Sequence, residues 1–544
     1  MTLQTKPQIL PPVATATNWT SDVPEGEFRW EYYVENRPLN IAYEAVTRHV
    51  EEGYGKKVAL YEVEGGQVRS YTFQEIDDLV RHYANVLRAL DVRRGERVAI
   101  FLPKCATNYI ALLAAIRIGA IAVPLFEAFM EEAIVDRVLD SGATTFITDE
   151  TLGQRVPLQR LPSIRHFLYT STIEQFTPKE EASIVYQDKE APFLLHYTSG
   201  STGKPKGVLH AQRAFYHQRL TGRWVLDLRD DDIYWCTSHP GWVTGSVYGF
   251  LAPWFNRATV VVHCGRFDAS EWYSVIEKLK VTVLYSAPTA YRLLIASDAH
   301  KQYDLSSVRH AMSVGEPLNP EVIHWFEQTL NIRLHDTWWM TETGAHLIVN
   351  APHAPVKPGS MGRAFPGITV GILNDTGELL PPYEVGHLAI QAPWPGLMKT
   401  IWNNEERFNQ YFNEEGWYHS GDLAYMDEDG YVFFASRDDD LIMSAGERIG
   451  PFEVESTLLE HEAVKEAGVV GVPDEVKGEV VKAYVTLHDH VEPSSLLEEQ
   501  LIQHVRTHLA AHAAPRYVEF IEELPKTVIS GKIMRRELKK RHRI

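Results

Sequence analysis

Positions 197–207 combine the residue types that bind phosphate. The segment reads Tyr-Thr-Ser-Gly-Ser-Thr-Gly-Lys-Pro-Lys-Gly. Glycines allow a backbone to fold closely around an anion, hydroxyl groups donate hydrogen bonds, and lysines add positive charge. The segment is not a Walker loop, because Pro205 follows Lys204 where that motif has Ser or Thr. The groups available to a polyphosphate belong to Thr198, Ser199, Gly200, Ser201, Thr202, Gly203, Lys204 and Lys206.

The residues around this loop predict its place in the fold. An apolar run at 193–197 predicts a buried strand before the loop, and a helical pattern is expected after it. A run rich in Ser and Gly is, on its own, more often a flexible surface turn than a ligand site. The interpretation therefore depends on what the rest of the chain contains.

The full string resembles the phosphate loop of the acyl-adenylate-forming superfamily, which includes acyl-CoA synthetases, luciferases and peptide-synthetase adenylation domains. Other segments resemble further motifs of this family in the same order, and the resemblance spans about residues 30 to 540. Within the superfamily, the pair Trp338-Trp339 and the segment 241–245 are most similar to acetyl-CoA synthetases. The further motif segments are 313–317, 335–344, 418–422, 436–439, 446–450 and 530–535.

The resemblance implies a two-step activation of a small carboxylic acid, with acetate expected. A carboxylate is a poor electrophile, because attack on it would have to expel oxide. Attack by its oxygen on the α-phosphorus of ATP gives an acyl-adenylate and pyrophosphate, and AMP then leaves when the thiol of coenzyme A attacks. The first step brings a carboxylate towards a polyanion, so catalysis should be mainly electrostatic. ATP and coenzyme A are the implied co-substrates, and Mg²⁺ is the implied cofactor.

By resemblance, one set of residues would act on the nucleotide. Thr198, Thr341, Glu342 and Lys532 would be catalytic, and Lys532 would bridge the acyl carboxylate and the α-phosphate. Glu342 would lie at the catalytic Mg²⁺, and His461 would lie beside a structural Mg²⁺. Further nucleotide contacts would come from Gly315, Glu316, Pro317, Asp336, Thr337, Trp338, Met340, Asp422, Arg437 and Arg448.

A second set would recognise the acid and coenzyme A. In the small pocket of acetyl-CoA synthetases the second tryptophan, here Trp339, closes the floor. Taken singly, most of these residues would be ordinary core or surface positions. The resemblance assigns Val243, Thr244, Val314 and Trp339 to the acyl pocket, Ala445, Gly446 and Arg506 to coenzyme A, and Asp439 to a hinge.

Three departures from the family's pattern lie near the hinge and the lysine. The segment 525–532 carries one more residue before Lys532 than the family's pattern has. Three acidic residues stand together at 438–440, where family members more often have an apolar neighbour. Ala445 stands where acetyl-CoA synthetases commonly carry a serine that faces coenzyme A.

The composition excludes other function classes. A formal net charge of −19 argues against a general nucleic-acid or anionic-membrane partner. Cys105, Cys236 and Cys264 lie far apart without CxxC spacing, which fits a reducing compartment. Residues 1–20 contain no apolar signal core, and the most apolar stretch, 109–130, is interrupted by Arg, Gly and Pro. A cytoplasmic protein is expected.

The elements that must position these residues follow an α/β pattern. From about residue 70, strand and helix patterns alternate, which predicts parallel sheets covered by helices. Turn signals between 359 and 430 predict hairpins or a small barrel. We expect a large N-terminal domain (1–436) of stacked α/β subdomains plus a small β-rich subdomain, holding the ATP and acyl site. A small mobile α+β domain (437–544) would carry the lysine and face coenzyme A.

Three other functions compete with acetate activation. Propionate or another short-chain acid differs from acetate by one or a few methylenes, and one CH₂ in an apolar pocket discriminates only about 10- to 200-fold. An enzyme that loads a carrier protein is weakened because no carrier domain follows in the chain. A non-catalytic binding relative is disfavoured by the presence of Lys532, Thr198, Asp422 and Arg437.

Replacement of Lys532 by alanine tests whether the two steps use separate groups. The variant should lose acid-dependent ATP–pyrophosphate exchange, yet keep most of its thioester formation from supplied acyl-adenylate. An equal loss of both steps would contradict this division. Because acetylation removes the charge of a lysine, an acetyltransferase and a deacetylase acting on Lys532 are expected partners.

Overall fold

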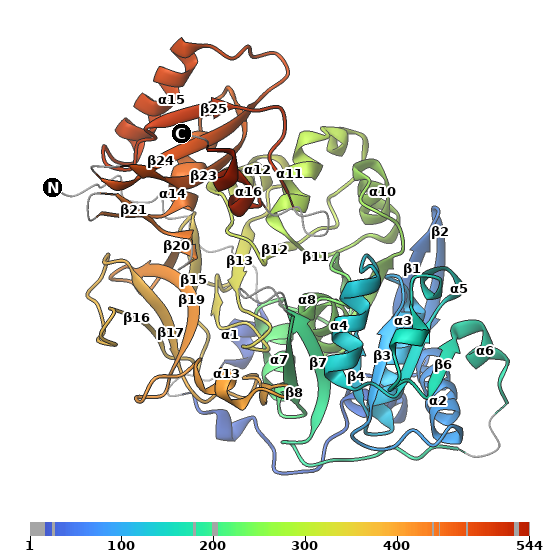
Figure 1. The fold of residues 1–544 in the computed structure, drawn as a ribbon. Coiled ribbons are helices and arrows are strands. Elements are labelled where there is room, and N and C mark those ends of the chain that lie inside the picture. Colours follow the sequence, from blue (N-terminus) through green and yellow to red (C-terminus); the bar gives the residue numbers. More distant parts are fainter. Residues whose placement is uncertain are drawn as a thin grey trace.

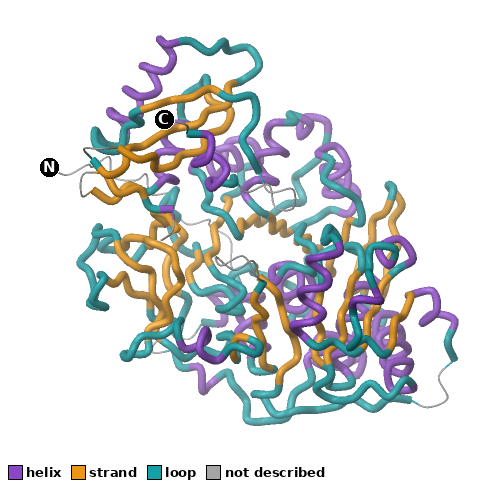
Figure 2. The backbone as a smooth tube through the Cα atoms, viewed as in Figure 1, coloured by secondary structure: helices purple, strands orange, loops and turns teal. Residues whose placement is uncertain are grey.

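The computed structural model describes residues 17–23, 28–177, 181–198, 205–437, 440–444, 447–474, 477–526 and 533–542. Within these residues the strands form three sheets, and helices pack against the two large sheets (Figure 1; Figure 2). The third sheet belongs to the C-terminal part of the chain. The predicted α/β fold, with a large N-terminal part and a smaller C-terminal one, is confirmed.

The first large sheet carries the phosphate loop at one end of two of its strands. Five neighbouring strands run parallel up to one edge, and the near-continuous burial of the inner ones matches a sheet that is covered on both faces. The order is β18 (Thr400–Ile401), β8 (Lys206–Ala211), β7 (Pro192–Thr198), β4 (Ile121–Pro124), β3 (Arg97–Phe101), β5 (Thr145–Thr148) and β6 (His166–Tyr169).

The prediction that a helix directly follows the phosphate loop is wrong. Residues 206–211 form strand β8, which runs antiparallel to β7 with Thr198 opposite Lys206. Helix α7 (Ala214–Trp224) begins only after this strand. Val208 and Leu209 are both buried between neighbouring strands, so burial on two faces favours a strand at this point. The loop therefore connects the two strands of a hairpin.

The second large sheet holds the other predicted site segments. Its parallel strands are β1 (Val58–Glu64), β10 (Thr259–His263), β9 (Ile233–Cys236), β11 (Val283–Ser286), β12 (His310–Val314) and β13 (Leu334–Trp338), with β2 (Gln67–Thr72) antiparallel at one edge. Beyond β13 the sheet continues through short antiparallel strands, β14 (Ile348–Val349) and β15 (Ser360–Ala364). These join it to hairpins made by β16 (Val370–Leu373), β17 (Gly386–Gln391), β19 (Trp417–Met426) and β20 (Val432–Arg437).

The helices of the large part cover these sheets with their apolar faces. One continuous buried cluster joins the two sheets, and it contains Phe193, Met312 and Trp338. The longer helices are α2 (Phe73–Ala89), α3 (Ala106–Arg117), α4 (Glu131–Ser141), α7, α10 (Ala269–Leu279), α11 (Pro288–Ala296) and α12 (Pro320–Leu330). The shorter ones are α1 (Asn18–Asp22), α5 (Glu150–Gly153), α6 (Thr170–Gln175), α8 (Val243–Ser246), α9 (Ala252–Phe255) and α13 (Glu405–Asn409).

The C-terminal part has a sheet and a core of its own. In Figure 1 it lies at the top left, above the hairpin strands. Ion pairs fix its last helix, because Arg535 donates to Glu455 at 2.7 and 2.8 Å. Its elements are β21 (Ile442–Ser444), β22 (Glu447–Ile449), β23 (Val464–Asp474), β24 (Gly478–Leu487), β25 (Tyr517–Phe520), α14 (Pro451–Leu459), α15 (Ser495–His508) and α16 (Arg535–Arg541).

We also compared the described helices with the length and apolarity that a lipid bilayer requires. None of the helices in the described ranges meets both requirements.

Candidate active site

The predicted nucleotide residues gather at the carboxyl ends of β12 and β13. The two strands are parallel neighbours, so the segments that follow them meet at one edge of the sheet. Gly315, directly after β12, has a positive φ of 83°, which glycine adopts without strain. The carboxylate of Glu316 accepts hydrogen bonds from the backbone and hydroxyl of Thr289 at the start of α11, at 3.2 and 2.6 Å. Glu316 therefore also anchors a neighbouring helix.

Asp422 joins two other predicted residues, Trp338 and Arg437. One of its carboxylate oxygens accepts from Trp338 Nε1 at 2.8 Å, and the other accepts from Arg437 Nη1 at 2.6 Å. Asp422 and Arg437 are register partners on β19 and β20, whereas Trp338 ends β13. The hairpin strands thus place a buried acceptor against the end of the parallel sheet.

An ion pair lies where the two large sheets approach each other. Lys206 Nζ, at the start of β8, is 2.5 Å from Glu342 Oε1 in the segment after β13. Burial would lower the pKa of Lys206, but the carboxylate of Glu342 raises it, so the ammonium group stays charged. Thr198, the register partner of Lys206, has a buried hydroxyl with no hydrogen-bond partner within the described ranges. A charge and a spare donor are therefore available for an anion here.

Tyr411 contacts both members of this ion pair, and the sequence did not predict it as a site residue. Its hydroxyl contacts Lys206 Nζ and donates to Glu342 Oε1 at 3.4 Å. Its ring stacks on Tyr418 with centroids 5.5 Å apart. No motif surrounds Tyr411, and its position 11 residues before Asp422 follows no periodic pattern. Tyr411 reaches the site because the segment that contains the short helix α13 packs against β18 and β19.

The acyl residues converge on one apolar cluster. Val314, Trp338 and Trp339 are buried in it, and Val243 packs against it from the start of α8. Thr244 is half-buried in the same helix. The indole of Trp339 meets the Tyr248 ring edge-on at 4.9 Å and donates to Tyr285 Oη at 3.3 Å. The indole is therefore fixed from two sides.

Several predicted residues lie outside the described ranges. They are the loop residues Ser199 to Lys204, the hinge residue Asp439, the pair Ala445 and Gly446, and the lysine Lys532. Lys526 and Ile533, which flank the segment with Lys532, form an antiparallel bridge. The two ends of this segment are thereby held together, so an additional residue between them need not displace either end.

The remaining predicted residues of the C-terminal part are spread out. Arg448 lies in β22 opposite Met443, and Arg506 is exposed on α15. The ring of His461 lies 5.4 Å from that of His504, and its Nδ1 accepts from Ala463 N at 3.3 Å. Mg²⁺ prefers oxygen ligands, and in the described part of the chain no three His, Cys, Asp or Glu side chains form a metal cluster. Glu342 offers the side-chain oxygens that Mg²⁺ prefers and so suits this ion together with phosphate oxygens, whereas a Mg²⁺ beside His461 stays a prediction.

The C-terminal part rests on β20 of the large part. Phe452 packs against Phe434 at 5.9 Å, and Asn319 Nδ2 donates to Ser456 Oγ at 3.2 Å. A Cβ atom on Gly450 would lie 2.3 Å from the carbonyl oxygen of Ala435. Only glycine permits this close approach, which directly precedes α14.

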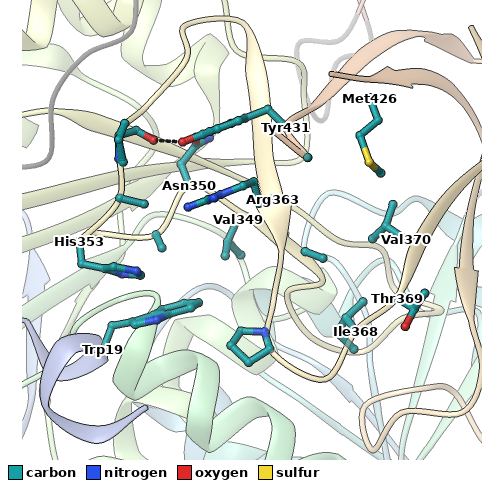
Figure 3. Close-up of a pocket in the computed structure, with 16 residues that line it drawn as sticks. Trp19, Val349, Asn350, His353, Arg363, Ile368, Thr369, Val370, Met426 and Tyr431 are labelled. Carbon is teal, nitrogen blue, oxygen red and sulfur yellow. Dashed lines mark hydrogen bonds between the residues drawn. The ribbon is translucent and has the colours of Figure 1, made fainter. Parts of the chain in front are cut away.

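A cavity of about 480 Å³ lies apart from these residues, between α1 and the segments around β15 and β16 (Figure 3). Trp19 and His353 form one wall with ring centroids 4.9 Å apart, and Tyr431 donates to the carbonyl of Pro355 at 2.5 Å. Arg363 lies between this wall and Tyr431. None of the predicted site residues lines this cavity.

Asp336 is the predicted site residue with a strongly shifted pKa. Burial raises the pKa of its carboxyl to about 7, although Ser313 Oγ donates to it at 2.5 Å and lowers the value in part. In an unfolded chain the pKa would be about 3.9. The folded protein then holds this proton more strongly than the unfolded chain, so its stability falls as the pH rises from about 4 to about 7.

Asp336→Asn should remove this pH dependence. Between pH 5 and pH 8, the wild type should lose about 2–3 kcal/mol more free energy of unfolding than the variant does. Urea unfolding at both pH values measures the difference. Asp136→Asn, at an exposed position on α4, is the control and should follow the wild type. Parallel pH profiles for wild type and Asp336→Asn would show that Asp336 is ionised throughout.

Comparison with known proteins agrees with this geometry. Residues 47–402 match the family model described as AMP-binding enzyme, and residues 453–532 match the one described as AMP-binding enzyme C-terminal domain. The chain is 52% identical over 516 residues to the acetyl-coenzyme A synthetase of Bacillus subtilis, covering 92% of this chain and 90% of that protein. It is 36% identical over 564 residues to that of Pyrobaculum aerophilum, covering 94% and 84%.

Solved structures share the whole architecture. The anthranilate CoA ligase AuaEII in complex with anthranoyl-AMP superposes with a TM-score of 0.85 at 28% identity, over 92% of this chain and 97% of that one. The acyl-CoA synthetase of Brucella canis superposes with a TM-score of 0.73 at 34% identity, over 94% and 97%. The predicted membership of the acyl-adenylate-forming superfamily is confirmed, and the chain belongs to the family of AMP-binding enzymes.

Proposed function

We propose that this protein is an AMP-forming acid–thiol ligase that converts acetate, ATP and coenzyme A into acetyl-CoA, AMP and pyrophosphate. The observation that carries the choice of acid is the fixed indole of Trp339, buried in the same apolar cluster as Val314. A large rigid ring at this place leaves little depth for an acyl chain. The high identity to a curated acetyl-CoA synthetase supports the same acid.

The first step needs positive charge and hydrogen-bond donors around the phosphates. Lys206 and the hydroxyl of Thr198 supply both at the mouth of the hairpin, and Ser199 to Lys204 would complete the loop. Thr341 would lie at the α-phosphate, next to Glu342. Mg²⁺, held by Glu342 and phosphate oxygens, would neutralise charge on the leaving pyrophosphate. Such a preorganised site stabilises charge without reorganising at the moment of reaction.

The nucleoside would be held by the residues that meet around Asp422. Its carboxylate would accept from the ribose hydroxyls, and it already holds Trp338 and Arg437 in place. The indole of Trp338 would lie against adenine, with Asp336 and the 315–317 turn at its edge. Fixing the nucleoside in this way places the α-phosphorus for attack, which converts a bimolecular step into an effectively unimolecular one.

The second step would use the C-terminal part. We place the division between the domains at Arg437, so that 1–436 form the adenylating domain and 437–544 form a mobile lid. Lys532 would serve adenylation, and rotation about Asp439 would then present Ala445, Gly446 and Arg506 to coenzyme A. Phe452 and Ser456 both belong to α14, so one helix makes these contacts with β20 and with the residue before α12, which is compatible with such a rotation.

Two further elements belong to this proposal. Acetylation of Lys532 by a protein acetyltransferase, reversed by a deacetylase, would remove the charge that adenylation needs. The enzyme would work in the cytoplasm, and the free thiols of Cys105, Cys236 and Cys264 fit a reducing compartment.

An acid panel tests the proposed reaction directly. Purified protein with ATP, Mg²⁺ and coenzyme A is given acids of two to eight carbons, and AMP and the CoA thioester are measured separately. Acetate should give the highest kcat/KM and equal amounts of both products. A preference for propionate would keep the reaction and change the acid, whereas AMP without thioester would contradict the ligase function.

Trp339→Gly should shift the preference to longer acids. Removing the indole opens space for several methylenes, and each CH₂ that becomes buried contributes about 0.8 kcal/mol. Acetate activity should fall, because the small acid is no longer held against the α-phosphate. The measurement is kcat/KM for the same panel, with the optimum expected between butyrate and octanoate. An unchanged order of acids would mean that Trp339 does not close the pocket.

A further inference from the structure

The hydroxyl of Tyr285 lies at the centre of a buried polar group behind Trp339. It is 3.3 Å from Trp339 Nε1, 2.8 Å from Thr337 Oγ1 and 2.9 Å from His346 Nε2. All four side chains are buried. Tyr285 comes from β11, two strands away from the end of β13, and none of the motifs in the sequence contains it.

The number of donor hydrogens on each group determines the direction of these hydrogen bonds. The hydroxyl of Thr337 donates to the carbonyl of Ser313 at 2.7 Å, so towards Tyr285 it can only accept. The single phenolic hydrogen of Tyr285 is therefore directed at Thr337. The indole N–H of Trp339 can only donate. Tyr285 Oη then accepts from both Trp339 and His346, and its capacity is filled.

These hydrogen bonds determine the protonation state of His346. Its Nε2 must carry a hydrogen to donate to Tyr285, and burial lowers its pKa well below 6.5, so the ring is neutral. Its Nδ1 has no hydrogen-bond partner in the described part of the chain. The ring lies flat on Tyr248 at 3.9 Å, and its backbone N–H donates to the Tyr248 hydroxyl at 2.9 Å.

The four rings therefore hold each other in place. Tyr248 stacks on His346 and meets the edge of Trp339, while Tyr285 bonds to both His346 and Trp339. An indole held by a hydrogen bond at Nε1 and by an edge contact on its ring cannot turn about its side-chain torsions without breaking one of them. Buried networks with every donor matched rigidify their surroundings in this way.

We infer that Tyr285, oriented by Thr337 and His346, is a positioning residue that limits acyl chain length by holding the plane of the Trp339 indole. This inference rests on the proposed function, in which the indole closes the acyl pocket. Tyr285 itself would not touch the acid. Its effect passes entirely through Trp339, so it should alter selectivity between acids more than the rate of adenylate formation.

Tyr285→Phe tests this role with the smallest possible change. The variant keeps the ring and removes the acceptor of Trp339 Nε1, so the indole can tilt and the pocket can deepen. The propionate-to-acetate ratio of kcat/KM should rise about tenfold, the lower end of what one CH₂ contributes to discrimination. The KM for ATP should stay within about twofold, because Thr337, the predicted nucleotide contact that Tyr285 touches, keeps its hydrogen bond to the carbonyl of Ser313.

Tyr109→Phe is the matched control. Tyr109 is also buried, and its ring stacks on Phe250 at 4.4 Å. Its hydroxyl has no hydrogen-bond partner within the described residues. This variant loses the same atom from a buried tyrosine and should keep the wild-type order of acids.

A pair of variants at His346 tests the network without changing Tyr285. Glutamine can supply an N–H donor in place of Nε2, whereas leucine of similar size cannot. His346→Leu should raise the propionate-to-acetate ratio, and His346→Gln should restore much of the wild-type value. A purely packing role for His346 would make the two variants equal.

The outcomes separate this inference from the proposed function. A wild type that does not form acetyl-CoA would contradict the proposed function, and the inference would fall with it. A wild type that prefers acetate, together with a Tyr285→Phe variant that keeps the wild-type ratio, would overturn the inference and leave the function intact. If Tyr285→Phe does not fold, equal ratios in wild type and His346→Leu overturn it instead.

Discussion

The ion pair between Lys206 and Glu342 connects the two large sheets at the point where the site forms. Lys206 begins a strand of one sheet, and Glu342 follows the last parallel strand of the other. A buried carboxylate without a partner would cost several kcal/mol, so loss of Lys206 alone would destabilise the contact between the two sheets at this point. The backbone of Met398 also donates to the carbonyl of Glu342 at 2.9 Å and ties in the segment before β18.

The ion pair with Glu342 also explains why Lys206 keeps a positive charge that a substrate can bind. An ammonium group has three donors, and within the described residues Lys206 uses two of them, on Glu342 Oε1 and on the hydroxyl of Tyr411. A phosphate can therefore approach a cation that is already oriented and kept charged by its carboxylate. This is the preorganisation that makes electrostatic catalysis effective in a partly buried site.

Much of the architecture could be predicted from the sequence, because the strong signals are local. Alternating strand and helix patterns predicted the parallel strands covered by helices, and turn signals predicted the hairpins between 359 and 430. The order of motifs predicted the family. Strand β8, which follows the phosphate loop, was not predicted, because a short run buried on both faces has no distinctive period. Strand β14 has only two residues, so nothing in its sequence indicates that it joins the parallel sheet to the hairpins.

The missed site residues share one physical property. Tyr411 and Tyr285 each contribute a single hydroxyl group whose partners come from distant segments of the chain. A hydrogen bond between side chains far apart in the chain leaves no trace in local composition. The predicted phosphate loop, by contrast, combines glycines and hydroxyl groups that have to be adjacent in the sequence to surround an anion. Residues that contact a ligand are therefore easier to predict from a sequence than residues that orient those contacts.

The antiparallel register of β7 and β8 has a consequence for how the phosphate loop can change in length. Thr198 and Lys206 are paired, and successive side chains of a strand point to opposite faces. An insertion between residues 199 and 205 would only enlarge the turn and leave both partners in register. An insertion inside β8 would exchange its two faces and direct the residues after it away from their present neighbours. Length variation in relatives of this chain should therefore be tolerated in the turn and excluded from the strand.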